Sequence, residues 1–366
     1  MSSLGVGLVG IGWCAAQHIK AFIKNPHTRV VALCGRDVER VKQTLAKNEI
    51  TLPGDVRITT DYNDLVSAKD IDIISIATPN DLHAAEAVAA ANAGKHLLIE
   101  KPTGMNEAEL IAIRDAVKRS GVRTIVSFEL RYNSLLKFIH WFRESGRLGE
   151  VRFARAHYLS RVTDWYAGWD WCRTTKGGGS HLLAAGCHAV DALRWCSGLE
   201  VAEVSAYHTH FTEGYEWPTT IDVNVKFQGK ALGHVTSSTD LMMPYTFGIE
   251  VMGDKATIRD NQILWKDHEI DLEELRAAQP FTDVTLHPST YGSASQSIRI
   301  DCIMPDSVDV DHHPFQAEID DFVDAILQKR ETMLNVFDAQ KTMEICLAAD
   351  KSASLNGTPV KLPLIA

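Results

Sequence analysis

The chain has 366 residues, of which 45% are hydrophobic and 23% charged, a composition typical of a soluble globular protein with more than one domain. Its formal net charge of −10 provides no positive field for nucleic acid or an anionic membrane surface, so we expect neither as a partner. No apolar run approaches the roughly 18 residues that a transmembrane helix needs.

Residues 1–128 alternate short apolar runs with helical patterns. We expect strands at 5–9, 30–34, 71–77, 96–99 and 124–128, and helices at 14–24, 38–47, 82–93 and 107–120. Short runs rich in Val, Ile and Leu are typical of parallel strands that are buried on both faces. The alternation therefore predicts right-handed βαβ units and an N-terminal Rossmann domain with a parallel sheet.

A G-x-G-x-x-A turn, Gly10 to Ala15, follows the first expected strand. The first glycine permits a tight turn, the second lets the backbone approach a pyrophosphate, and the small last residue lets helix and strand pack closely. The phosphates would lie on free N–H groups at the helix N-terminus. The predicted cofactor contacts of this turn are Gly10, Gly12, Trp13, Cys14 and Ala15.

The end of the second strand bears on the choice between NAD and NADP. NAD-binding proteins tend to place an acid there for the ribose 2′-hydroxyl, but this chain has Gly35. Arg36 could pair with a 2′-phosphate; alternatively, it is a solvated charge beside Asp37 as a helix N-cap. Both cofactors stay open, with a slight preference for NADP.

Two further segments follow expected strands at the carboxyl edge of the sheet, where open α/β sheets bind ligands. Residues 77–83 read ATPNDLH, and residues 100–102 read EKP. A partly desolvated lysine beside an oxidised nicotinamide would have a lowered pKa and could exchange a proton with a substrate hydroxyl. The alternative is a surface ion pair. The predicted cofactor contacts are Thr78, Pro79, Asn80, His83, Glu100 and Lys101.

Residues 129–366 change to an α+β pattern. Strands are expected at 151–159, 201–208, 220–227, 230–237, 247–252 and 256–259, and helices at about 134–146, 181–197, 315–329 and 337–355. The alternation of apolar and polar residues predicts a large, mainly antiparallel open sheet with helices on one side. The last helix is a candidate for packing back onto the Rossmann domain.

The number and spacing of the cysteines indicate the cellular compartment in which the protein is expected. There are seven, scattered through apolar contexts without a C-x-x-C pair, and the apolar N-terminus lacks the leading Lys or Arg of a signal peptide. We expect free thiols, a cytoplasmic location and no cysteine-based zinc site.

The stretch GGGSHLLAAGCHAVD, residues 177–191, places His181, His188 and Asp191 on one expected helix. A histidine in an apolar helix is more often a satisfied core residue than a catalyst. Whether these histidines are catalytic has to be judged from the rest of the chain.

With these motifs in this order, the chain resembles the Gfo/Idh/MocA oxidoreductases, which include glucose–fructose oxidoreductase and inositol dehydrogenases. The resemblance extends over nearly the full length, to FQAEIDDF at 315–322 and GTPVKLP at 357–363. It implies Lys101 and His188 as catalytic residues, Glu100 as a cofactor contact and no metal. The family often has an aspartate four residues before the histidine; Ala184 departs from this, and Asp191 is a candidate to orient His188 instead.

The predicted substrate site draws on several segments. The aromatic loop 164–173 could wall a sugar or fill an interface, because aromatic rings suit both. Its better pocket candidates are Asp164, Trp165 and Arg173. The predicted substrate residues are Arg131, Asp164, Trp165, Arg173, His181, Ala184 and His188.

The resemblance implies hydride transfer between NAD or NADP and a hydroxyl or ketone of a sugar, polyol or inositol. One alternative is an enzyme that keeps its cofactor and uses transient redox for glycoside cleavage or epimerisation. Another is a sugar or nucleotide sensor without catalysis. A homodimer or homotetramer through the C-terminal sheet is also implied.

Overall fold

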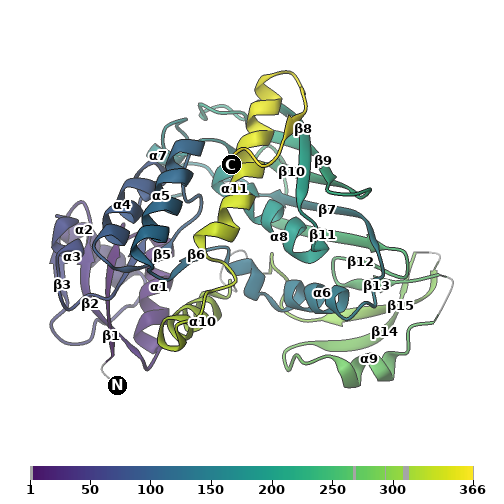
Figure 1. Ribbon diagram of the computed structural model, residues 1–366, viewed down its shortest axis with the longest axis horizontal. Helices are drawn as coiled ribbons and strands as arrows, with labels where there is room; N and C mark the ends of the chain where they lie inside the picture. Colours follow the sequence, from purple (N-terminus) through teal and green to yellow (C-terminus); the bar gives the residue numbers. More distant parts are fainter. Residues whose placement is uncertain (1–2, 267–268, 293, 308–312, 366) are drawn as a thin grey trace.

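The computed structural model describes residues 3–266, 269–292, 294–307 and 313–365. Two sheets organise the chain, one on each side of Figure 1, and the long helix α11 (Val336–Ser354) runs between them.

The first sheet has the order β3-β2-β1-β4-β5-β6, and every neighbouring pair is parallel. Its strands are β1 (Leu4–Val9), β2 (Thr28–Cys34), β3 (Arg57–Thr59), β4 (Ile73–Ile76), β5 (His96–Ile99) and β6 (Thr124–Val126). The helices are α1 (Trp13–Lys24), α2 (Val38–Lys47), α3 (Asn63–Val66), α4 (Asn80–Asn92) and α5 (Glu107–Ser120). This is the Rossmann order, and the strand order reverses between β1 and β4, which makes a ligand crevice at their carboxyl ends.

The second sheet has ten strands in the order β14-β15-β13-β12-β11-β7-β10-β9-β8-β16. Among the described strands of this sheet, only β7 and β10 pair in parallel, so the predicted, mainly antiparallel sheet is confirmed. The strands are β7 (Val151–Leu159), β8 (Val201–Thr209), β9 (Thr220–Phe227), β10 (Leu232–Ser238), β11 (Thr246–Gly253), β12 (Thr257–Arg259), β13 (Gln262–Leu264), β14 (Thr285–Tyr291), β15 (Ala294–Asp301) and β16 (Val360–Lys361).

The helical segments of this half hold the sheet to the Rossmann domain. Besides α11, they are the 3₁₀ turn η1 (Glu129–Tyr132), α6 (Ser134–Glu144), α7 (Trp169–Cys172), the π-helical turn η2 (Leu182–Gly186), α8 (Cys187–Ser197), α9 (Leu272–Ala278) and α10 (Phe315–Gln328). Helix α8 packs on β7, β10 and β11, while α11 packs on β8 and also contacts α5.

Helix α10 lies beside α1, as Figure 1 shows near its lower edge. Asn25, just after α1, donates to Asp320 at 2.7 Å, and Ser127, just after β6, donates to Glu318 at 3.0 Å. The C-terminal part of the chain therefore returns twice to the nucleotide half, through α10 as well as through the last helix. The two halves are fixed against each other.

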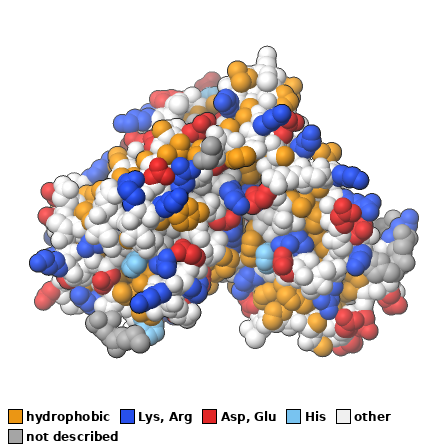
Figure 2. Space-filling model, viewed as in Figure 1, with side chains coloured by type: hydrophobic (Ala, Val, Ile, Leu, Met, Phe, Trp, Pro, Cys, Tyr) orange, Lys and Arg blue, Asp and Glu red, His pale blue; other side chains and the backbone are white. Residues whose placement is uncertain are grey.

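The visible surface carries basic and acidic side chains interspersed rather than in one large patch (Figure 2). In the described part of the chain, none of the helices is both long and apolar enough to span a bilayer.

Candidate functional site

The turn after β1 has the shape that a pyrophosphate requires. Gly10 has φ +82°, and a Cβ there would lie 2.4 Å from the amide nitrogen of Thr78, so only glycine fits. A Cβ at Gly12 would meet nothing closer than 4.0 Å, which leaves the approach to the backbone open. No side chain caps α1, and its first turn carries no acid, so its N–H groups are available to an anion.

The remaining residues of this turn pack against neighbouring parts of the protein. Ala15 is fully buried where α1 meets the sheet, and the ring of Trp13 lies 6.0 Å from that of Phe315 in an edge-on contact. Burial raises the pKa of the Cys14 thiol well above its ordinary value. The turn thus lies between β1 and α1, and Phe315 of α10 packs against its Trp13; its contacts with a dinucleotide stay predictions.

At the end of β2, the absence of an acid has a steric cause. A Cβ at Gly35 would lie 2.5 Å from a methyl group of Val41, so α2 packs directly on this glycine. Asp37 caps α2 by accepting from the amide of Arg40 at 2.8 Å. Arg36 is exposed, and its side chain is available at this edge.

His83 fixes the segment that follows β4 through contacts of its ring nitrogens. Its two ring nitrogens lie 2.7 Å from the carbonyl oxygen of Pro102 and 2.8 Å from that of Thr78. Through these two contacts the buried His83 joins the two strand-end segments, and its contact with the cofactor stays a prediction. Asn80, which follows Pro79 in the first turn of α4, is buried, and its Nδ2 has no protein partner among the described residues. This donor is suited to a bound group.

Lys101 lies at the carboxyl end of β5 beside the buried Glu100. The backbone amide of Lys101 donates to Glu100 Oε2 at 3.2 Å, and His18 Nε2 lies 3.3 Å from Oε1. Burial lowers the pKa of Lys101, but the Glu100 carboxylate and the neighbouring Cys187, Cys14 and Tyr158 together outweigh burial and raise that pKa above its usual value. With Glu100 beside it, Lys101 is an ammonium ion, and the lowering of its pKa by an oxidised nicotinamide stays a prediction.

The lysine reaches the helix that carries His188. Lys101 Nζ donates at 3.0 Å to the carbonyl oxygen of Ala184, within η2 and one turn before His188. Burial lowers the pKa of His188 to about 4, and the charge of Lys101 contributes to this lowering. Its ring lies between Tyr158, which stacks at 5.9 Å, and Phe128, edge-on at 5.8 Å. An ammonium ion and a neutral imidazole thus approach each other from the two halves of the chain.

Arg131 and Asp191 form a buried ion pair with each other, which differs from the roles predicted for them. Arg131 makes two hydrogen bonds to Asp191, at 2.7 and 2.6 Å, and a third to Asp338 at 2.6 Å. We therefore correct both predictions: Arg131 does not face a substrate, and Asp191 does not orient His188.

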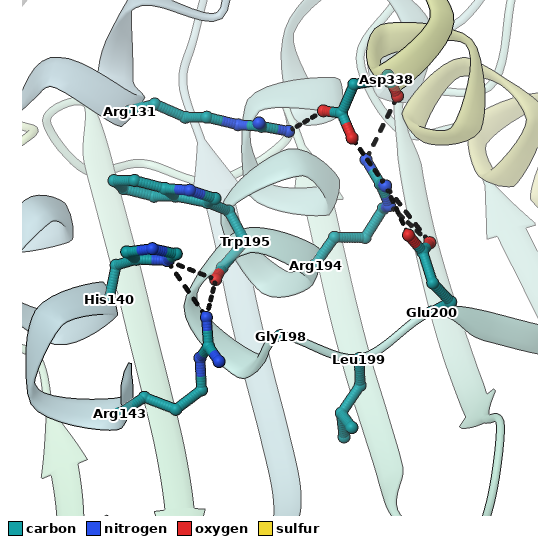
Figure 3. A pocket seen from close by; sticks show the side chains of 9 residues that line it. All are labelled: Arg131, His140, Arg143, Arg194, Trp195, Gly198, Leu199, Glu200 and Asp338. Carbon is teal, nitrogen blue, oxygen red and sulfur yellow. Dashed lines mark hydrogen bonds and ion pairs between the residues drawn. The ribbon is translucent and has the colours of Figure 1, made fainter. Parts of the chain in front are cut away.

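Arg131 instead borders a surface cavity of about 170 Å³ that is lined by residues of α6, the C-terminal end of α8 and α11, shown in Figure 3. There Arg194 pairs with both Glu200 and Asp338, and the ring of Trp195 stacks on His140 at 4.3 Å. The carboxylates around this cavity already pair with the guanidinium groups of Arg131 and Arg194. The side chains that line the cavity therefore form an ion-pair network that joins α8 to α11.

The aromatic loop 164–173 places its predicted pocket residues at the surface or in a contact between loops. Asp164 and Trp165 are exposed, and Arg173 donates to the carbonyl oxygen of Gly214 at 3.5 Å, which ties two loops together. Tyr166 is half-buried, and its ring lies 6.3 Å from that of Trp171. A contact of Asp164, Trp165 and Arg173 with substrate stays a prediction.

His181 is a satisfied core residue. Its Nδ1 lies 2.7 Å from the Ser237 hydroxyl, and its Nε2 lies 3.3 Å from that of Ser160. We correct its predicted substrate contact, because both nitrogens are occupied.

Two sequence models match the chain. One, described as an oxidoreductase family with an NAD-binding Rossmann fold, matches residues 4–128; the GFO/IDH/MocA C-terminal domain matches residues 140–259. Levoglucosan dehydrogenase of Pseudarthrobacter phenanthrenivorans is 32% identical over 215 residues, which are 56% of this chain and 54% of that protein. Inositol 2-dehydrogenase of Salmonella typhimurium is 26% identical over 208 residues, 56% of this chain and 58% of that protein.

This chain therefore matches little more than half the length of these two relatives. A solved structure of levoglucosan dehydrogenase in complex with NADH superposes over 100% of both chains with a TM-score of 0.81 and 21% identity, which shows a shared fold. Together with the Rossmann sheet and its glycine turn, the two matched domains show that the chain belongs to the GFO/IDH/MocA oxidoreductase family.

Proposed function

We propose that the protein is an NAD(P)-dependent oxidoreductase that interconverts a hydroxyl and a ketone on a sugar, polyol or inositol. The observation that carries this proposal is the approach of Lys101 to the helix of His188 at the carboxyl edge of the parallel sheet. The names of the relatives support the substrate class, since levoglucosan and inositol are polyhydroxylated rings.

The chain's own groups divide the work as follows. The turn Gly10–Ala15 would hold the pyrophosphate, and Asn80 offers a buried donor to the same ligand. When bound, the dinucleotide supplies the hydride acceptor or donor. Lys101, as an ammonium ion, donates to the reacting oxygen and stabilises negative charge there. His188, as a neutral imidazole, accepts the hydroxyl proton.

For the choice of dinucleotide, we keep the preference for NADP. Arg36 is exposed at the end of β2, and neither Gly35 nor the helix cap Asp37 provides a free acid for a 2′-hydroxyl. For assembly, we propose that the ten-stranded sheet joins copies into a dimer or tetramer. Tyr207 on β8 and Leu232 on β10 support this, with 60% and 54% of their surfaces exposed. A cytoplasmic location also stays a proposal; the seven cysteines are free thiols.

The test combines binding and turnover. The affinities for NADH and NADPH are measured by fluorescence titration, and NAD(P)H production is then followed with a panel of sugars, inositols and anhydrosugars. Steady production with at least one polyol is the expected result. Sugar conversion with only a catalytic amount of cofactor would show a transient-redox enzyme instead, and cofactor binding without any conversion would show a sensor.

A further inference from the structure

A buried carboxylate, Glu129, lies between two imidazoles. Glu129 begins η1 and is 3% exposed. His313, just before α10, donates from Nδ1 to Glu129 Oε1 at 2.7 Å, while His188 Nε2 lies 3.9 Å from the same oxygen. The three side chains come from segments far apart in the sequence, and no motif of the sequence marks them as a group.

The charge state of Glu129 follows from its neighbours. Burial opposes its ionisation, but the nearby His188, the hydrogen bond from His313 and the charge of Lys101 outweigh burial and lower its pKa to about 2. At neutral pH the group is therefore a carboxylate. An ionised carboxylate accepts hydrogen bonds and donates none, so it favours an N–H on each nitrogen that faces it.

This preference decides which nitrogen of His188 is free. A neutral imidazole carries one proton, and the carboxylate facing Nε2 favours the tautomer with the proton there. Nδ1 then keeps its lone pair. Among the described residues, the buried Nδ1 of His188 has no hydrogen-bond partner. The ring is held in place by Phe128 and Tyr158, so the free nitrogen has a fixed direction.

We propose that Glu129, clamped by His313, is the positioning residue for His188. It keeps the imidazole proton on Nε2 so that Nδ1 is the atom that accepts the substrate's proton. The inference rests on the proposed function. In the oxidation step the substrate O–H bond breaks and its proton forms the Nδ1–H bond. The carbon–oxygen double bond forms as the hydride on the same carbon passes to the oxidised dinucleotide that the proposed function requires. The resulting imidazolium ion is stabilised by the Glu129 carboxylate.

Glu129 thus provides the orienting carboxylate for His188 that neither Ala184 nor Asp191 provides. Ala184 has no carboxylate, and Asp191 is engaged by Arg131 and by the hydroxyl of Thr342 at 2.9 Å. The ionisable groups that interact with His188 or Glu129 from the packed elements are Glu100, Lys101, His313, Glu318, Tyr158, Tyr245, Cys14 and Cys187. The described residues bring together no set of His, Cys, Asp or Glu side chains that could hold a metal ion.

The chain offers a matched control in Glu318 on α10. It is fully buried in the same region and accepts from the Ser127 hydroxyl at 3.0 Å. Burial, together with the charges of Glu129 and Glu100, raises its pKa well above the usual value, which favours the neutral carboxylic acid. Glu318→Gln therefore keeps both its shape and its charge, whereas Glu129→Gln keeps the shape and removes a charge.

The experiment measures the free protein first. In protein labelled with ¹⁵N-histidine, His188 is identified by the signals missing from His188→Asn. Wild type and Glu318→Gln should show His188 with the proton on Nε2 and an unprotonated Nδ1. Glu129→Gln should show a mixture of tautomers, because a neutral amide presents either its oxygen or its N–H group. This readout needs neither cofactor nor substrate.

Turnover is the second readout. Glu129→Gln should lower kcat for alcohol oxidation by about tenfold or more with KM little changed, because orientation of a general base acts on the chemical step. Glu129→Asp, which keeps the charge on a shorter side chain, should recover part of the loss. Glu318→Gln should keep the wild-type kcat.

The outcomes separate the two proposals. If wild type oxidises no polyol, the proposed function fails, while the tautomer of His188 still tests the role of Glu129. If Glu129→Gln keeps both the Nε2–H tautomer and its kcat, the inference about Glu129 is overturned. Equal loss of activity in Glu318→Gln also overturns it, since the effect would then come from packing in this region.

Discussion

Replacing Asp191 with Asn tests the reassignment of this residue from the active site to the ion-pair network. The change removes a charge from a pair in which Arg131 and Asp191 have side chains only 4% and 3% exposed. Breaking one side of such a buried pair costs about 3–5 kcal/mol of folding free energy, because a charge is left without its partner. Arg131 keeps its bond to Asp338 at 2.6 Å, so we expect the lower end, about 3 kcal/mol.

At roughly 2–4 °C per kcal/mol, this loss corresponds to a Tm lower by about 6–12 °C. Scanning calorimetry measures it, and Asp70→Asn is the control. Asp70 also accepts two hydrogen bonds from one arginine, Arg57, at 2.8 and 3.0 Å, but the pair is 40% and 51% exposed and should contribute at most about 1 kcal/mol.

Burial is thus the main difference between the two pairs. Equal Tm losses in the two variants would refute the argument from burial. A changed His188 tautomer in Asp191→Asn would show that Asp191 orients the histidine after all.

Three further predictions follow from the site. Lys101→Met should lower kcat by about 10²–10⁴-fold while fluorescence titration shows nearly unchanged NAD(P)H affinity; a comparable loss of affinity would mean that Lys101 mainly binds cofactor. Arg36→Gln should raise KM for NADP and leave KM for NAD nearly unchanged in steady-state assays; equal changes in both would remove its role with the 2′-phosphate. Burial lowers the pKa of His181 and His188 from 6.5 to about 4, so the unfolded chain binds more protons between these values. The free energy of unfolding should therefore fall as pH drops from 6.5 towards 4, and urea unfolding at pH 7 and pH 5 should show a smaller fall in His181→Asn.

The strands that the sequence predicted best are those with a strong hydrophobic pattern. The runs at 151–159 and 220–227 match β7 and β9 residue for residue. By contrast, β3 is only three residues long with no buried residue, and β14 reads TLHPSTY, in which only Leu286 is buried. Strands of this kind gain their order from hydrogen bonds to neighbours, which a pattern of side-chain polarity does not report.

The candidate site could be predicted where it depends on local sequence. The glycine turn and the lysine after β5 are local features, and both lie where expected. The partners of Glu129 and Arg131 are not local: His313 is 184 residues from Glu129, and Asp191 is 60 residues from Arg131. Pairings at such separations are set by the packing of α8 and α10, so a single sequence gives no signal for them.

The contact between Lys101 and η2 uses a carbonyl oxygen, which every amino acid possesses. Another small residue at position 184 would therefore keep the hydrogen bond from Lys101 Nζ to the backbone carbonyl oxygen. The pitch of the backbone is under tighter control: a Cβ at Gly186 would lie 2.2 Å from the Ser237 hydroxyl oxygen, so the widened turn tolerates little bulk there. Exchanges between small residues at 184 would accordingly leave the position of the lysine unchanged, on a turn that is held constant two residues away.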